Sequence, residues 1–312
     1  MNMPSVDLEK LLEETSRTFA LSIPLLPEPT RREVTIAYLL FRIADTFEDA
    51  SHWSIERRVE ALAAFRDLLT APSASEARRL AQEWGAAGVS PHEGYARLIA
   101  ETPEVLEAFF ALSPGAVGSI RPHVQRSTDG MAGFVRRTGE NGELSLRDVA
   151  DLKSYCYVVA GIVGEMLTDL FLLGREALAP AAPYLVERAA TFGEALQLVN
   201  ILKDSESDAL EGRRYLPPGA DRAEVFLLAR SDLNAATEYI LKLREAGAPR
   251  GLVAFTALPV LLAWAALEKI EREGPGSKVS RPEVFAIAAK LELDLAFGRA
   301  PLTLRETAAA GR

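Results

Sequence analysis

Apolar residues recur at helical spacing along most of the chain, in long stretches rich in Ala, Leu, Glu and Arg. Such stretches favour helices, and the strict alternation of apolar and polar residues that marks a strand is scarce. Prolines and glycines interrupt the stretches and mark their ends. Helices are therefore predicted near residues 5–20, 30–49, 54–70, 75–86, 91–100, 103–111, 115–138, 146–173, 182–209, 221–229, 231–247, 250–272 and 281–296.

Helix starts are indicated by side chains that can accept a hydrogen bond from a free backbone N–H. Ser54 and the pair Ser231-Asp232 are of this kind. No low-complexity linker divides the chain into two halves, and no internal repeat of fixed period is present. The pattern therefore predicts one all-α domain over residues 1–312.

Composition narrows the class of protein. The 312 residues are 48% hydrophobic and 25% charged, as in a globular protein rather than a disordered or collagen-like chain. The net charge of −9 disfavours a nucleic-acid partner, which a basic surface would bind. Cys156 is the single cysteine and the three histidines are scattered, which excludes an intrachain disulfide framework and a thiolate zinc site.

Neither a signal peptide nor a membrane span is predicted. Residues 1–16 carry several charges and no apolar core. The longest apolar run, residues 252–267, contains Pro259 and is about four residues short of the ~20 that span a bilayer. We therefore expect a cytoplasmic protein in which this run forms a buried helix.

The predicted helix 30–49 carries a polar stripe on an otherwise apolar surface. Its second half is apolar around most of its circumference, which is typical of a buried helix. Four polar residues nevertheless follow at steps of 4, 3 and 4 and so share one face: Tyr38, Arg42, Asp45 and Asp49. The carboxylates of Asp45 and Asp49 lie one turn apart and point the same way.

The predicted helix 182–209 repeats this arrangement near its end. Its surface around residues 192–202 is again mostly apolar. Four polar residues follow at steps of 3, 4 and 4 on one face: Gln197, Asn200, Asp204 and Asp208. The last two form a second pair of carboxylates one turn apart.

The two acidic pairs indicate a site for a cation. Like charges one turn apart destabilise a helix unless a cation lies between them, and buried carboxylates are costly unless they are paired or bound to metal. The alternative is an ordinary solvated helix face, where most charged residues lie. Carboxylates without His or Cys favour Mg²⁺, which leaves room for substrate phosphate oxygens. Two buried pairs that face each other across an apolar cavity would therefore hold a diphosphate through Mg²⁺.

Four segments, in this order, resemble the squalene/phytoene synthases, which join two prenyl diphosphates head to head. They are SRTFA (16–20), YLLFRIADTFEDA (38–50), YCYVVAGIVGEMLTDLF (155–171) and QLVNILKDSESDALEGRRYLP (197–217). The DTFED form of the first acidic motif, GMAGF (130–134) and FTALPVLLAWAAL (255–267) are similar to the squalene synthase branch. The resemblance implies an all-α isoprenoid synthase fold, with helices around a deep apolar central cavity and the acidic motifs facing each other at its mouth.

The resemblance also implies roles for individual residues. The family usually has Arg at the position of Lys203, and Lys lacks the bidentate phosphate geometry of Arg. For the basic residues the alternative role is a surface salt bridge, and for Asn200 it is a structural hydrogen bond. The expected metal ligands are Asp45, Asp49, Asn200, Asp204 and Asp208. The expected diphosphate-binding residues are Ser16, Arg17, Tyr38, Arg42, Gln197, Asn200, Lys203 and Arg213.

Tyr155 begins the central motif and is, by resemblance, the residue that orients the prenyl cation or exchanges a proton with it. A tyrosine pKa near 10 makes it a weak base, so the leaving diphosphate is an alternative base. A packed core tyrosine is the structural alternative. Ala160, Gly161 and Gly164 have little bulk, which indicates close helix packing or room for a prenyl chain. Lys278 and Arg281 lie in a Gly/Pro-bounded loop similar to a mobile basic segment of squalene synthases.

The implied reaction has two halves. One farnesyl diphosphate ionises, the double bond of a second attacks the allylic cation, and proton loss gives presqualene diphosphate. This product ionises and rearranges, after which hydride from NADPH gives squalene or proton loss gives dehydrosqualene. No G-x-G-x-x-G fingerprint follows a strand, so NADPH use stays open. Peripheral membrane contact is expected for release of the apolar product, and the oligomeric state stays open.

Three other functions are weighed against this one. The first is phytoene synthase, which uses geranylgeranyl diphosphate and would need a deeper cavity. The second is a non-catalytic helical relative, which has no reason to retain two acidic pairs. The third is a solvated helical interaction protein, whose helices should be amphipathic, whereas residues 34–47 and 192–203 are not.

Overall fold

The computed structural model of the chain describes residues 7–16, 18–139, 143–219 and 221–305. These residues are mostly helical, with a single pair of two-residue strands, so the all-α prediction is confirmed. The α-helices are α1 (Leu8–Thr15), α2 (Phe19–Ser22), α3 (Thr30–Glu48), α4 (Ile55–Thr70), α5 (Ala74–Ala86), α6 (Glu93–Ala100), α7 (Thr102–Phe110), α8 (Pro114–Val135), α9 (Val149–Cys156), α10 (Ile162–Leu172), α11 (Ala182–Leu210), α12 (Arg222–Glu245), α13 (Arg250–Glu273) and α14 (Arg281–Ala296). The 3-10 helices are η1 (Ile23–Leu25) and η3 (Glu176–Ala181), and a π-helical turn is η2 (Tyr157–Gly161).

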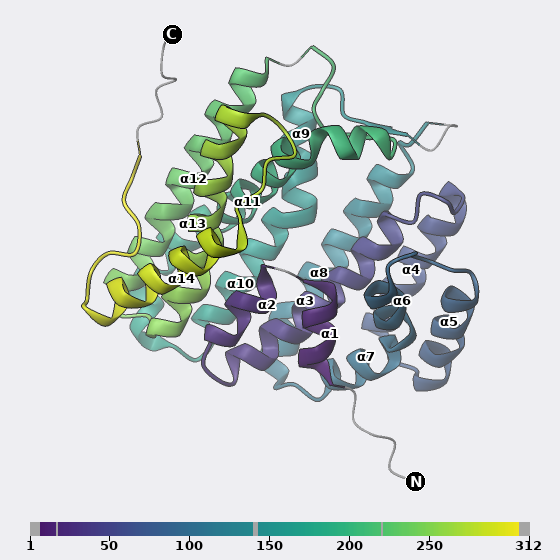
Figure 1. Cartoon of the computed structure of the whole chain (residues 1–312). Coiled ribbons are helices and arrows are strands. Elements are labelled where there is room, and N and C mark those ends of the chain that lie inside the picture. Colours follow the sequence, from purple (N-terminus) through teal and green to yellow (C-terminus); the bar gives the residue numbers. More distant parts are fainter. Residues whose placement is uncertain (1–6, 17, 140–142, 220, 306–312) are drawn as a thin grey trace. The chain divides into compact units, whose positions relative to one another are not determined.

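Figure 1 shows the helices coloured along the chain. They divide into two compact units. The first comprises residues 1–24 and 28–142, and the second comprises residues 25–27 and 143–312. The expectation of one domain over residues 1–312 stays a prediction.

The first unit is built around α3, which packs against α1, α7 and α8. Leu39, Leu40 and Ile43 on α3 are fully buried, in agreement with the apolar pattern of this segment. Tyr38 and Asp45 stay partly exposed on the one face that the core leaves free. The polar stripe predicted for this helix is therefore present.

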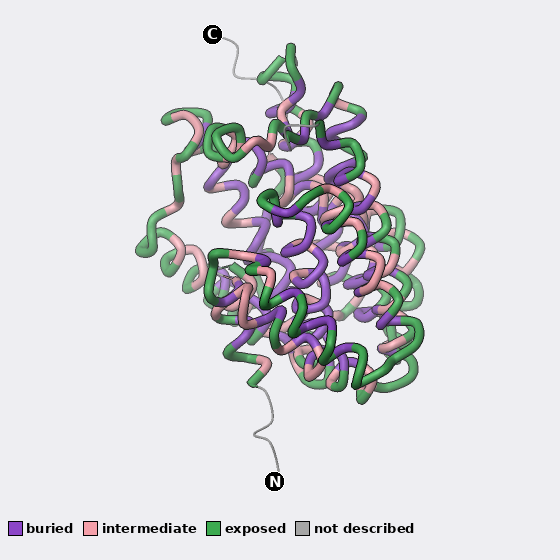
Figure 2. Tube along the Cα trace, turned by 90° about the vertical axis from the view of Figure 1, so that its right-hand side faces the viewer, coloured by how far each residue is buried: buried purple, intermediate pink, exposed green. Residues whose placement is uncertain are grey.

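The second unit is built around α11, which packs against α10, α12, α13 and the π-helical turn η2. The helix α13 adds large apolar side chains to this core, among them Phe255 and Trp264. Burial follows the interior faces of these helices, as the tube in Figure 2 shows. The apolar run at 252–267 therefore lies in a mostly buried helix, as predicted.

Two glycines let α11 approach the preceding helical segment at backbone distance. A Cβ atom at Gly164 would lie 2.0 Å from the carbonyl oxygen of Ala189. A Cβ atom at Gly193 would lie 1.9 Å from the carbonyl oxygen of Ala160. Neither position has space for a larger residue. The small residues of the central motif thus serve close helix packing, one of the two alternatives that the sequence left open.

A short parallel strand pair ties the second acidic motif to the start of the second unit. The strands β1 (Leu144–Ser145) and β2 (Arg213–Arg214) pair in the register Leu144 with Arg213 and Ser145 with Arg214. Gly212 precedes β2 with a φ of 80°, a left-handed conformation that glycine adopts without strain. The pairing holds Arg213 just beyond the end of α11.

Two predicted helix boundaries are wrong. The predicted helix 5–20 is interrupted at Ser16, whose backbone is extended and whose hydroxyl accepts a hydrogen bond from the N–H of Phe19 at 2.9 Å. The predicted helices 221–229 and 231–247 are one continuous helix, α12. Asp232 does not cap a helix start, because it lies in the middle of α12 and is buried. Asp221 is the actual N-cap and accepts from the N–H of Ala223.

Two helical stretches are long and apolar enough to cross a membrane by length and composition. They are Val149–Leu172, with a mean hydropathy of 1.5, and Arg250–Glu273, with 1.8 over the most apolar window. Buried residues make up 56% and 72% of these windows, as in core helices of soluble proteins. Such stretches are weak evidence for a membrane span, and the absence of one stays a prediction.

Candidate active site

In the first unit, Arg42 is the centre of a polar cluster on α3. Its Nε donates to the hydroxyl of Tyr38 at 3.2 Å, and its Nη1 is ion-paired with Asp45. The Tyr38 hydroxyl in turn donates to the carbonyl oxygen of Thr15 at 2.8 Å. Tyr38, Arg42 and Asp45 of the predicted stripe are thus joined by hydrogen bonds, and the Tyr38 end is held by α1.

Two aromatic rings hold the Arg42 guanidinium by cation–π contacts. The guanidinium carbon lies 5.5 Å from the ring centroid of Tyr38 and 5.4 Å from that of Tyr95. Burial alone would lower the pKa of Arg42, but the negative charge of Asp45 and the two tyrosines raise it above its ordinary value. Arg42 is therefore a permanent, preoriented cation beside the first acidic pair.

Tyr95 was not predicted as a site residue. It belongs to α6, and Gly94 lets that helix approach α1, since a Cβ there would lie 2.5 Å from the carbonyl oxygen of Glu14. Burial raises the pKa of Tyr95, Arg42 lowers it, and the charges of Asp45 and Asp49 raise it. Both carboxylates therefore act on the same ring, as expected for side chains on one face.

The second unit holds the other polar cluster, at the end of α11. The ammonium of Lys203 donates to the Asn200 side-chain oxygen at 3.0 Å and lies 3.2 Å from a carboxylate oxygen of Asp204. The Arg213 guanidinium lies 3.5 Å from Asp208 and 2.6 Å from Glu211. Each carboxylate of the second pair thus has its own basic partner.

Asp208 is a half-buried carboxylate whose surroundings disfavour its ionised form. Burial raises the pKa of Asp208, Arg213 lowers it, and the negative charges of Asp204 and Glu211 raise it again. The pKa remains above the ordinary value despite the ion pair. A bound cation would favour the ionised carboxylate and so offset both its burial and the neighbouring negative charges.

The expectation that the four aspartates are buried is wrong. The side chains of Asp45, Asp204 and Asp208 are 30%, 37% and 18% exposed, and Asp49 is exposed at the C-cap of α3. Each pair lies at the border of its apolar core. There, both basic side chains and water can stabilise the negative charge of the carboxylates. An exposed border also leaves the carboxylates accessible to a ligand.

The loop predicted to resemble a mobile basic segment is joined to the second acidic motif. The backbone N–H of Gly276 donates to the carbonyl oxygen of Lys203 at 2.7 Å. Lys278 and Arg281 follow shortly after this contact and are exposed. The hydrogen bond places this stretch of chain beside the α11 cluster.

Tyr155 is a buried residue of α9, with 3% of its surface exposed. Its hydroxyl donates to the hydroxyl of Tyr215 at 3.1 Å, and the two rings stack with centroids 4.7 Å apart. Tyr215 follows β2 directly, two residues after Arg213. Tyr215 was not predicted, although it lies in the quoted second acidic motif, and it connects Tyr155 to that motif.

The remaining predicted residues are less clearly part of either cluster. Ser16 ends α1 and caps α2, which gives it a structural role in addition to the predicted one. Arg17 lies outside the described residues. Gln197 is half-buried on the face of α11 that also carries Asp204. Within the part of the chain that the structure describes, no group of three or more His, Cys, Asp or Glu side chains forms a ready metal site.

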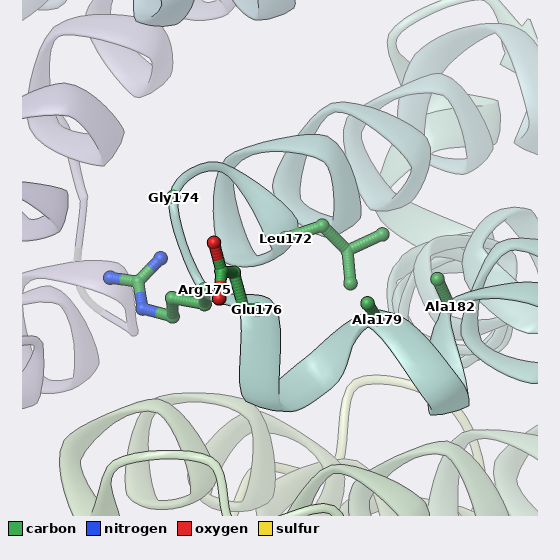
Figure 3. A pocket seen from close by; sticks show the side chains of 6 residues that line it. All are labelled: Leu172, Gly174, Arg175, Glu176, Ala179 and Ala182. Atoms are coloured by element: carbon green, nitrogen blue, oxygen red, sulfur yellow. The ribbon is translucent and has the colours of Figure 1, made fainter.

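A surface pocket of about 320 Å³ lies in the second unit (Figure 3). Leu172, Arg175, Ala179 and Ala182 line it, at the end of α10 and along η3. The Arg175 guanidinium donates to the carbonyl oxygens of Leu170 and Phe171, so it caps α10. Ala182 begins α11, about 33 Å along this helix from the Asp204 turn, so the pocket is separate from the acidic motif.

Comparison with known proteins identifies the family. Residues 12–218 match the sequence model of the family described as squalene/phytoene synthase. The match covers more than half of the chain, which therefore belongs to the squalene/phytoene synthase family, a family of prenyltransferases. The resemblance inferred from the four motifs is confirmed.

Individual relatives agree with the squalene synthase branch. The squalene synthase of Schizosaccharomyces pombe is 27% identical over 301 residues, which are 90% of this chain and 61% of the relative. The squalene synthase of Saccharomyces cerevisiae is 30% identical over 210 residues, which are 67% of this chain and 44% of the relative. The chain thus spans about half of the length of these curated relatives.

Solved structures share the fold. TcSQS in complex with the ligand BPH1237 superposes with a TM-score of 0.75 at 24% identity, over 93% of this chain and 87% of that one. A dehydrosqualene synthase in complex with a ligand superposes with a TM-score of 0.54 at 18% identity, over 93% and 95%. The chain therefore has the all-α isoprenoid synthase fold.

Proposed function

We propose that this protein catalyses the Mg²⁺-dependent head-to-head condensation of two farnesyl diphosphates to presqualene diphosphate, and its onward conversion to squalene or dehydrosqualene. One observation carries the proposal. Each unit presents two carboxylates one helical turn apart at the border of its apolar core, and basic side chains are already bound to Asp45, Asp204 and Asp208. A family that joins two prenyl diphosphates needs two such clusters.

The clusters have the chemistry to bind diphosphate. Arg42, Lys203 and Arg213 each engage a carboxylate and have N–H groups that can turn to phosphate oxygens. The rings of Tyr38 and Tyr95 keep Arg42 in place during such an exchange.

The donor atoms fit Mg²⁺, which prefers carboxylate and amide oxygens to nitrogen or sulfur. Asp45 and Asp49 would hold the metal in one cluster, and Asn200, Asp204 and Asp208 would hold it in the other. The raised pKa of Asp208 fits this role, because burial, and after it the charges of Asp204 and Glu211, disfavour the ionised carboxylate that a cation would stabilise. When bound, Mg²⁺ supplies the charge neutralisation that makes diphosphate a good leaving group.

The protein's other task is to handle the carbocation. Tyr155 is buried and its hydroxyl is oriented by Tyr215, so it can direct its oxygen at a cationic carbon or exchange a proton with it. The apolar faces that flank the polar stripes of α3 and α11 would hold the prenyl chains and exclude water. Without such exclusion, water would convert the cation to an alcohol.

The test is incubation with farnesyl or geranylgeranyl diphosphate and Mg²⁺, with and without NADPH, followed by mass analysis of the products. Presqualene diphosphate or a C30 hydrocarbon is expected from farnesyl diphosphate. A C40 product formed only from geranylgeranyl diphosphate would make the protein a phytoene synthase. No product from either substrate would show a non-catalytic relative, and full activity in EDTA would remove the metal from the proposal.

A further inference from the structure

The outward side of α14 is apolar, although it faces water. On a helix of 3.6 residues per turn, a group of apolar residues between positions 285 and 297 falls within an arc of about 120°. No charged residue of α14, which is described over its whole length, falls inside this arc. All members of the group are exposed, and we call them the outer face of α14: Phe285, Ala286, Ala289, Leu293, Ala296 and, at the C-cap, Phe297.

Large side chains make up most of the outer face. Phe285, Leu293 and Phe297 are 64%, 57% and 70% exposed. The helix α14, yellow in Figure 1, packs against α13 with its other side, where Leu291 is buried. Single exposed apolar residues are ordinary, whereas a contiguous exposed apolar surface marks an interaction site. The outer face therefore indicates a partner that covers it.

Basic side chains border the outer face at its C-terminal end. Lys290 and Arg299 share one carboxylate, that of Asp294. The Asp294 side chain is buried, whereas both basic side chains are exposed. Positive charge therefore faces solvent while its counter-charge does not. Arg244 of α12 lies at the same end, because its guanidinium donates to the carbonyl oxygen of Gly298.

The start of α14 is basic as well. Lys278 and Arg281 are exposed there. Over residues 278–305, five basic side chains outnumber three acidic ones, so this stretch carries a net charge of +2. The whole chain carries −9. An anionic surface would therefore attract the protein through this stretch and repel the remainder of the chain.

An anionic lipid surface matches these features better than a second copy of the chain does. The apolar side chains of a surface helix enter the boundary between headgroups and acyl chains, while flanking Lys and Arg bind anionic headgroups. Two copies paired through their outer faces would bring cations together whichever way the helices run, because both ends of α14 are basic. The charges therefore favour lipid as the partner.

The helix α14 also begins close to the second acidic motif. Gly276 donates its backbone N–H to the carbonyl oxygen of Lys203 at 2.7 Å, and Phe285 follows nine residues later. Squalene and dehydrosqualene are hydrocarbons without a polar group, so lipid dissolves them and water does not. An outer face in contact with a bilayer would bring this end of the site close to lipid.

We propose that the outer face of α14 docks the protein on a membrane that contains anionic lipid. Phe285, Leu293 and Phe297 enter the interface between headgroups and acyl chains, and Lys290 and Arg299 bind the headgroups. Docking rests on the exposed face and its charges, whereas release of the product into the bilayer rests on the proposed function.

The test is flotation of the full chain with vesicles of phosphatidylcholine, made with or without phosphatidylserine. Phe285→Ser, Phe297→Ser and Lys290→Gln change the proposed surface. Val186→Ser on α11 and Arg78→Gln on α5 are matched controls, because both side chains are exposed and lie outside the outer face. Circular dichroism confirms that each variant is folded, and sedimentation velocity measures its oligomeric state.

The wild type should bind vesicles with phosphatidylserine more tightly than vesicles without it, and added salt should reduce the difference. Phe285→Ser and Phe297→Ser should each weaken binding roughly tenfold, because each removes a large apolar side chain from the interface. Lys290→Gln should weaken binding by roughly fivefold, and only on vesicles with phosphatidylserine. The two control variants should bind as the wild type does.

Three results would overturn the proposal. The first is a folded wild type that binds neither kind of vesicle. The second is equal binding by Phe285→Ser, Phe297→Ser and Val186→Ser, which would place docking elsewhere on the protein. The third is a wild-type dimer that Phe297→Ser dissociates, which would assign the outer face to a second copy of the chain.

Turnover of farnesyl diphosphate in detergent tests the proposed function separately. Vesicle binding without turnover would leave docking standing and refute the function. Turnover without vesicle binding would leave the function standing and refute docking.

Discussion

The close crossing of the π-helical turn η2 and α11 allows the packing to be tested with Gly193→Ala. A Cβ at this position would lie 1.9 Å from the carbonyl oxygen of Ala160 and 2.6 Å from its carbonyl carbon. Both atoms belong to the backbone, so no side-chain rotation relieves the contact. An ordinary contact begins near 3.4 Å, so the two helices would have to separate by about 1.5 Å.

The expected energy is the sum of two opposing terms. Replacing Gly by Ala inside a helix stabilises it by about 1 kcal/mol. Overpacking a core costs about 1–3 kcal/mol, and a backbone clash lies at the upper end of this range. Gly193→Ala should therefore lower the free energy of unfolding by about 2 kcal/mol.

Gly133→Ala is the matched control. Gly133 lies within α8, and a Cβ there would meet nothing within 4 Å. The same substitution should therefore raise the free energy of unfolding, by roughly 0.5–1 kcal/mol.

Urea unfolding followed by circular dichroism measures both variants against the wild type. Opposite signs for the two changes are expected. If Gly193→Ala were as stable as Gly133→Ala, α11 would not approach Ala160 as described, and the packing argument would fail.

Three further predictions concern the polar residues. Asp204→Asn keeps the shape of a half-exposed side chain and removes a ligand charge. Turnover should therefore collapse, while the free energy of unfolding in urea changes by less than about 1 kcal/mol. Unchanged turnover would favour a solvated helix face. Tyr155→Phe removes the hydrogen bond to Tyr215, so it should cost about 1 kcal/mol of stability in the same assay, and native turnover would make Tyr155 a packing residue. The pKa of Asp232 rises from 3.8 to about 7 on folding, so the carboxyl stabilises the fold fully below pH 3.8 and this stability is lost as the pH rises to about 7. The wild type should lose up to about 4 kcal/mol of unfolding free energy over this pH range, and Asp232→Asn should not. If the unfolding free energies of the two proteins had the same pH dependence, the raised pKa of Asp232 would be contradicted.

Local sequence was enough to predict the helices and the acidic stripes. Side chains three or four residues apart share a helix face whatever the rest of the chain does, so Asp45 with Asp49, and Asp204 with Asp208, follow from spacing alone. The same local reasoning gave the apolar character of α3, α11 and α13. The order of the four motifs then pointed to the family.

The sequence misjudged Asp232 because local and tertiary signals conflict there. Ser231-Asp232 has the composition of a helix start, yet α12 continues through it. The apolar residues on both sides, such as Leu233 and Ala236, pack against the core and keep the segment helical. Asp232 is therefore buried, and burial raises its pKa. No short sequence pattern predicts this.

Only the tertiary structure decided which distant residues complete each cluster. Tyr95 reaches Arg42 because Gly94 lets α6 approach α1, and Tyr215 reaches Tyr155 because the two-residue strand pair holds the chain after α11. These contacts join residues more than fifty positions apart. Spacing along one helix contains no information about them, because they depend on how closely different helices pack.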